Sequence, residues 1–64
     1  MSQREAALLH LKDVLNHLLA CRQQLEWAEE PQTARLLTET MIRDLDCCRR
    51  LCETLNRRAA LQVG

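Results

Sequence analysis

Five leucines set the pattern of the first half of the chain. Successive members are three, four, three and seven residues apart, and Arg22 occupies the one skipped position: Leu8, Leu11, Leu15, Leu18 and Leu25. This is the a/d spacing of a heptad repeat, so it predicts a long helix with a narrow apolar seam. Small apolar residues recur every seven positions beside the seam and make the face wide enough for more than one neighbouring helix: Ala7, Val14, Cys21 and Ala28.

The second half of the chain carries a matching seam. Its apolar residues step by three or four, with Leu51 alongside: Ala34, Leu37, Met41, Leu45, Cys48, Cys52, Leu55 and Ala59. The opposite side alternates in charge, and each acid lies four residues before an arginine: Glu39, Arg43, Asp46, Arg50, Glu53 and Arg57. That spacing is typical of ion pairs on a solvent-exposed helix face. The pattern therefore predicts a second long helix with one face in water.

Capping residues and one proline mark the boundaries of these helices. Ser2 and Glu5 match the S-x-x-E capping box. Glu29-Glu30-Pro31 is the one break in the pattern, and Pro31 suits the first position of a new helix. We predict a single domain over residues 1–64, with a first helix at about 3–29, a turn at about 29–31 and a second helix at about 31–60.

Such a short connection makes the two helices antiparallel neighbours, in which the numbers of contacting positions sum to about 59 or 60. A chain of 64 residues is small for a self-sufficient core. Two helices cannot shield two wide seams from water, whereas two copies can. We therefore predict an all-α antiparallel two-helix hairpin that dimerises into a four-helix bundle. Another helical protein that supplied the second pair of helices would satisfy the same requirement.

Charge and composition narrow the classes of partner. Nine basic and nine acidic side chains give a formal net charge of zero, which argues against nucleic acid or an anionic membrane as the partner. No run of 18 apolar residues is present, so no transmembrane helix is expected. Residues 1–5 lack the apolar segment of a secretory signal, and Cys47 and Cys48 are adjacent. We expect reduced cysteines and a cytoplasmic location.

The cysteines of the second helix are candidate metal ligands. Cys48 and Cys52 are four residues apart, and the predicted register places His10 between them in height. Thiolates and imidazole bind copper or zinc, so the set His10, Cys47, Cys48 and Cys52 could hold either metal. Free cysteine also packs as a small apolar residue, and Cys48 and Cys52 occupy seam positions. Packing without a metal is our main interpretation, and the metal site is the alternative.

Asp13, His17 and Cys21 follow one another at steps of four on the first helix. They could be interpreted as a hydrolytic set, with Cys21 as nucleophile and His17 as its base. Residues at consecutive steps of four on one helix form no cleft, and no oxyanion donor accompanies them. We therefore predict no catalytic residues and no enzymatic activity, and we place His10 and His17 at the edge of a helix interface.

Trp27 is the single aromatic residue and lies beside the turn, off the seam. It is expected to cover the turn against Leu36 or to mark a partner site. Together these patterns predict a small interaction or scaffold module without a cofactor, acting through self-association or binding of a partner helix. A copper- or zinc-binding bundle is the alternative. The predicted interface is Leu8, Leu11, Leu15, Leu18, Leu25, Trp27, Leu37, Met41, Leu45, Cys48, Leu51, Cys52 and Leu55.

Overall fold

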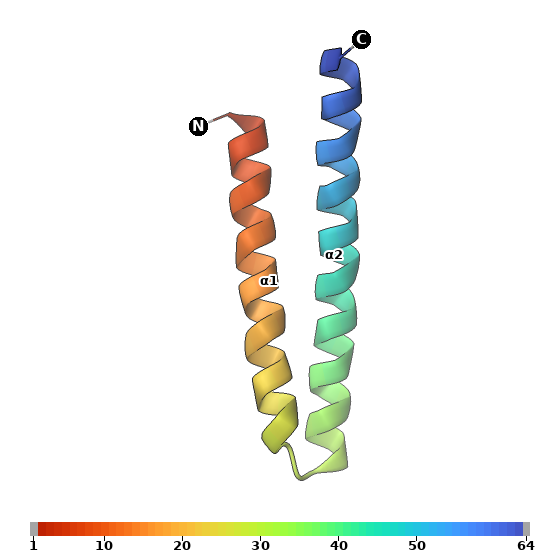
Figure 1. Cartoon of the computed structure of the whole chain (residues 1–64). Coiled ribbons are helices and arrows are strands. Elements are labelled where there is room, and N and C mark those ends of the chain that lie inside the picture. Colours follow the sequence, from red (N-terminus) through yellow and green to blue (C-terminus); the bar gives the residue numbers. More distant parts are fainter. Residues whose placement is uncertain (1, 64) are drawn as a thin grey trace.

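The chain forms an antiparallel hairpin of two helices (Figure 1). The computed structural model describes the backbone of residues 2–63 and the side chains of residues 2–57. Helix α1 spans Gln3–Trp27 and helix α2 spans Pro31–Val63, with no strand in the described part of the chain. The predicted all-α hairpin is thereby confirmed. Its dimerisation remains a prediction.

Local interactions place the helix ends close to the predicted ones. The Ser2 hydroxyl accepts a hydrogen bond from the Glu5 amide at 3.1 Å, as the capping motif predicted. Helix α1 ends at Trp27, two residues earlier than predicted, because Ala28 has extended backbone angles (φ −71°, ψ 119°). Helix α2 begins at Pro31 and continues past residue 60 to Val63. No glycine or proline interrupts that last stretch, and Ala and Leu are strong helix formers.

A line of buried and half-buried side chains, here called the inner seam, runs between the two helices. On α1 it follows the small residues beside the leucine stripe, and its members are Ala7, Leu11, Val14, Leu18, Cys21, Leu25 and Ala28. On α2 its members are Ala34, Leu37, Met41, Asp44, Cys48, Leu51 and Leu55. Cys21, 4% exposed, is the one buried side chain among those described, and the other members are half-buried. Ala59 of the predicted seam lies outside the described side chains.

The hairpin is a single layer of helices. Its principal extents are 51 × 18 × 12 Å, and its radius of gyration is 15.0 Å. A compact chain of this length would have a radius of gyration of about 10.7 Å. Figure 1 shows the two helices side by side with neither broad face covered by another element. Over the described residues, neither helix combines the length and the apolar content needed to cross a membrane.

Candidate functional site

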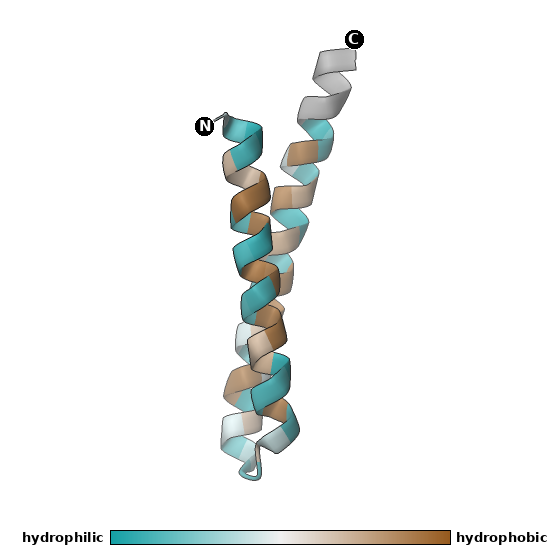
Figure 2. Cartoon of the chain, turned by 60° about the vertical axis from the view of Figure 1, so that its left-hand side comes forward, coloured by the Kyte–Doolittle hydropathy of each residue, from teal (hydrophilic) through white to brown (hydrophobic). Residues whose placement is uncertain are grey.

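Large apolar side chains are exposed along both helices of the single chain. Eight of them are between 43% and 81% exposed: Leu8, Leu9, Leu15, Leu19, Trp27, Leu36, Ile42 and Leu45. Leu8, Leu15 and Leu19 are seven and four residues apart, so they form one strip along α1. Figure 2 shows apolar segments recurring along α1 and along the neighbouring part of α2. The inner seam therefore uses only part of the apolar surface.

The exposed strips of the two helices lie on the same side of the hairpin. His17 of α1 contacts Asp44 of α2. The flank of α1 that carries His17 and the flank of α2 that carries Asp44 therefore lie on the same face of the hairpin. At about 100° per residue, Leu15 lies about 160° around α1 from His17, and Leu45 lies about 100° around α2 from Asp44. Both leucines therefore point to the opposite face. We call this surface the apolar face; its members are Leu8, Leu15, Leu19, Ile42, Leu45 and Cys52.

Charged pairs lie at the end of the apolar strip of α1 and along the outside of α2. Arg22 and Glu26 pair at 3.5 Å on α1. On α2 the predicted Asp46–Arg50 pair is present at 2.6 Å, and Arg49 binds both Asp46 at 2.8 Å and Glu53 at 2.9 Å. The hydrogen bond from Arg49 and the positive charges of Arg49 and Arg50 lower the pKa of Asp46. Polar groups thus border the apolar strip, as at the rim of many protein interfaces.

The second feature is a cluster of His17, Cys21 and Asp44 on the edge of the inner seam. The Nε2 atom of His17 lies 3.8 Å from the Sγ atom of Cys21, one turn further along α1. The Nδ1 atom of the same ring contacts Oδ2 of Asp44, which projects from α2. The possible ligand atoms of the three residues all lie within 4.8 Å of one another. The side chain of His17 is 54% exposed and that of Asp44 is 18% exposed.

The partner of His17 differs from the one that the sequence suggested. Asp13, four residues earlier on the same helix, was grouped with His17 and Cys21, but the carboxylate that contacts the imidazole is that of Asp44. Asp44 follows Met41 by three residues and precedes Cys48 by four, so its spacing marks an inner-seam position. The numbers of His17 and Asp44 sum to 61, close to the predicted register. Those two signals together make Asp44 a candidate partner of His17, and the rotation of α2 about its own axis decides between Asp44 and Asp13.

The alternative metal set does not gather in the structure. Within the described residues, His10, Cys47, Cys48 and Cys52 form no cluster of possible metal ligands. Cys47 and Cys52 are five residues apart, which is about 140° around a helix, so their side chains leave α2 in different directions. Burial raises the pKa of the Cys48 thiol, and the neighbouring Cys47, Cys52 and Asp44 raise it further. Metal binding by this set remains an untested alternative.

The predicted interface residues divide between the two surfaces. Eight belong to the inner seam: Leu11, Leu18, Leu25, Leu37, Met41, Cys48, Leu51 and Leu55. Four belong to the exposed apolar face: Leu8, Leu15, Leu45 and Cys52. Trp27 is 81% exposed and Leu36 is also exposed, so the expected packing of Trp27 over the turn is not found. Trp27 follows Leu25 by two residues, which places it about 200° around α1 from the inner seam.

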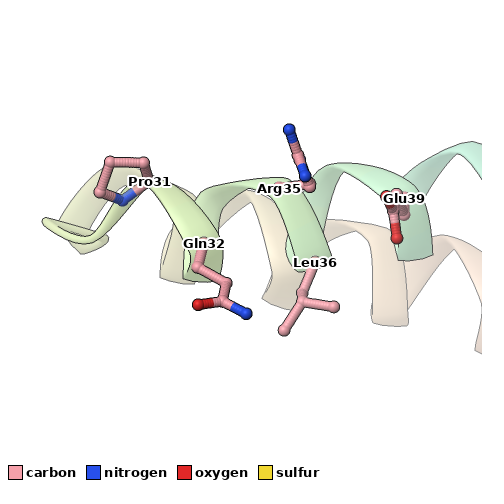
Figure 3. Close-up of a pocket in the computed structure, with 5 residues that line it drawn as sticks. All are labelled: Pro31, Gln32, Arg35, Leu36 and Glu39. Atoms are coloured by element: carbon pink, nitrogen blue, oxygen red, sulfur yellow. The ribbon is translucent and has the colours of Figure 1, made fainter.

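Two surface hollows lie near the turn. One is lined by residues from the first turns of α2 alone, and Figure 3 shows them around an open surface: Pro31, Gln32, Arg35, Leu36 and Glu39. The other is lined by Ala20, Gln23, Gln24, Trp27, Ala28 and Thr33. Neither includes a residue of the His17–Cys21–Asp44 cluster. The cluster therefore lines neither hollow, and Cys21 itself is buried.

Comparison with known protein families, curated proteins and solved structures finds no match to this chain.

Proposed function

We propose that this chain is a small non-enzymatic interaction module that self-associates through its apolar face. The observation that carries the proposal is the alignment of exposed leucines from both helices on one side of the hairpin. Leu15 and Leu45 are 51% and 56% exposed in the single chain, although both belong to heptad-like seams. Two such strips on one surface favour a helical partner that covers them together.

The solvent-exposed area of the chain is large enough for a second copy to be the partner that covers the apolar face. The chain exposes 5323 Å². A compact monomer of 7.4 kDa is expected to expose about 4,200 Å². The excess of roughly 1,100 Å² is comparable with the area of about 800 Å² that each partner buries in a standard protein interface. A second copy of the hairpin therefore provides enough surface to remove this excess.

A second copy also matches the chemistry of the surface. A two-fold interface requires a patch that complements itself, and an apolar strip packs well against another apolar strip. The zero net charge means that two copies have no overall repulsion. The product is an antiparallel four-helix bundle whose core contains both apolar faces and whose outside carries the ion pairs of α2. We place this module in a reducing, cytoplasmic setting, since all four of its cysteines are free.

The test measures the mass of the full chain in solution by sedimentation equilibrium, under reducing conditions and with a chelator present. Aspartate is introduced on the apolar face as Leu15→Asp or Leu45→Asp. The matched controls are Leu9→Asp and Leu36→Asp, at leucines of similar exposure, 48% and 59%. Leu9 lies about 120° around α1 from Leu15, and Leu36 lies about 180° around α2 from Leu45. Helical content is followed by circular dichroism for each variant.

The expected result is a dimer for the natural sequence and for both controls, with a dissociation constant raised at least tenfold in the two apolar-face variants. A tenfold change corresponds to about 1.4 kcal/mol, well below the cost of burying an unpaired carboxylate. A natural chain that is monomeric at all accessible concentrations would contradict the proposal and assign the face to a different protein. Equal dissociation of controls and apolar-face variants would also contradict it.

A further inference from the structure

We infer that His17, Cys21 and Asp44 form a zinc site that is built across the two helices. His17 Nε2 and Cys21 Sγ would bind the ion directly. Asp44 would act through the other ring nitrogen of His17, as a positioning residue. This inference does not depend on self-association, because all three residues belong to one chain and none of them lies on the apolar face.

The separation of the two direct ligands suits a zinc ion. Zinc binds imidazole nitrogen at about 2.0 Å and thiolate sulfur at about 2.3 Å, so a tetrahedral site separates the two atoms by about 3.6 Å. In the structure, Nε2 of His17 and Sγ of Cys21 are 3.8 Å apart. Both residues project from α1 one turn apart, and the backbone of a regular helix holds that spacing. Little movement is needed for an ion to enter between the two atoms.

The contact between Asp44 and His17 sets the ring in the state that a metal requires. When the Nδ1–H group donates a hydrogen bond to the Asp44 carboxylate, the neutral ring keeps its lone pair on Nε2, the nitrogen that lies next to Cys21. Carboxylate–histidine–metal arrangements of this kind orient the ring and raise its basicity. Asp44 comes from α2 and is only 18% exposed, so the inner seam holds it in place. Folding of the hairpin therefore prepares the imidazole for the ion.

The surroundings provide both a route for the ion and a balance of charge. His17 is 54% exposed, so an ion can reach Nε2 from solvent, while buried Cys21 closes the inner side. On binding, the Cys21 thiol loses its proton to solvent, and the ion takes the place of that proton between sulfur and nitrogen. Water fills the remaining positions around the ion. The thiolate and the Asp44 carboxylate together offset the two positive charges of zinc.

The test titrates Co²⁺, and then Zn²⁺, into the full chain with a reductant that contains no thiol. Cobalt in such a site gives a thiolate charge-transfer band, and zinc should remove the band by displacement. We expect one ion per chain. His17→Ala and Cys21→Ser should abolish the band, whereas Asp44→Asn should weaken binding by about 10- to 100-fold, as loss of an outer partner does elsewhere.

Two variants serve as matched controls. Asp13→Asn removes the other carboxylate four residues from His17, and Cys52→Ser removes an exposed cysteine of α2; both should bind cobalt like the natural chain. His17 is exposed, so His17→Ala should keep its helical content even if Cys21→Ser unfolds. A natural chain without the band, a band that survives in His17→Ala, or a band lost in Cys52→Ser would overturn the inference. The sedimentation test is made in chelator, so each proposal can fail without the other.

Discussion

The two broad faces of this hairpin are built from the same two helices and differ in whether their side chains find partners within the chain. On one face His17 contacts Asp44 and Cys21, so its polar groups are satisfied by the fold itself. On the apolar face Leu8, Leu15 and Leu45 remain roughly half exposed. The polar cluster on one side of the molecule is therefore satisfied within the chain, while the leucines on the other side stay exposed.

The difference between the two faces arises from the rotation of α1 about its own axis relative to α2. The leucine stripe of α1 could have faced α2 directly. Instead only part of the stripe packs there, beside the small residues Ala7, Val14 and Cys21; its members in the inner seam are Leu11, Leu18 and Leu25. Leu8 and Leu15 are turned outward as a result. The comparison shows that the neighbouring helix buries one part of a wide apolar helix face and leaves the other part exposed.

The largest expected effect comes from a change in the inner seam, because packing there holds the two helices, and with them both faces, in place. Leu18→Asp would place a carboxylate at a half-buried position between the two helices. We expect a loss of stability of about 3 kcal/mol or more, which is a large fraction of what so small a chain can have. Circular dichroism should show loss of most helical signal. Leu18→Met is the control and should keep it; a well-folded Leu18→Asp would mean that the inner seam is not the folding core.

A smaller expected effect is a difference in the alkylation rates of two cysteines that lie on the two faces. Cys52 lies on the apolar face, whereas half-buried Cys47 lies on the flank that carries His17. If a second copy covers the apolar face, alkylation of Cys52 should become several-fold faster in Leu15→Asp than in the natural chain, and that of Cys47 should change little. Mass spectrometry after brief labelling with iodoacetamide measures both rates. Equal acceleration at the two cysteines would indicate general loosening instead of an uncovered face.

The smallest expected effect is a pH-dependent change in stability, and it concerns the ion pairs along the outside of α2. The bond from Arg49 lowers the pKa of Asp46 in the folded chain below its ordinary value of 3.8. The pairing of Asp46 therefore contributes stability that is fully present above that ordinary value and is lost as the pH falls through the lowered one. Asp46→Asn should lower the melting temperature slightly at pH 7 and leave it unchanged near pH 2. A difference that persists at the lower pH would assign the effect to packing.

Much of the fold follows from periodicity and capping. The a/d spacing predicted the two helices, and Ser2 and Pro31 marked where they begin. The register was predicted to within about two residues, because a short turn leaves two antiparallel helices little freedom to slide. Helix α1 ends at Trp27, two residues earlier than predicted. The prediction missed this end because no sequence signal marks the extended conformation of Ala28.

The candidate site was only partly predictable. The pairing of His17 and Cys21 follows from their spacing on one helix. The choice of Asp44 over Asp13 does not, because it depends on which flank of α2 faces His17. Likewise, the sequence showed that Leu15 and Leu45 are seam residues without showing that both would remain outside the inner seam.

The amino-acid sequence by itself determined that the chain forms two long helices in a hairpin, since helical periodicity, capping and a single proline act locally. Only the tertiary structure decided the rotation of each helix about its own axis. That rotation depends on packing between residues far apart in the chain, and small side chains allow the closest approach. It placed the carboxylate of Asp44 against His17 and left the leucines of the apolar face in contact with water.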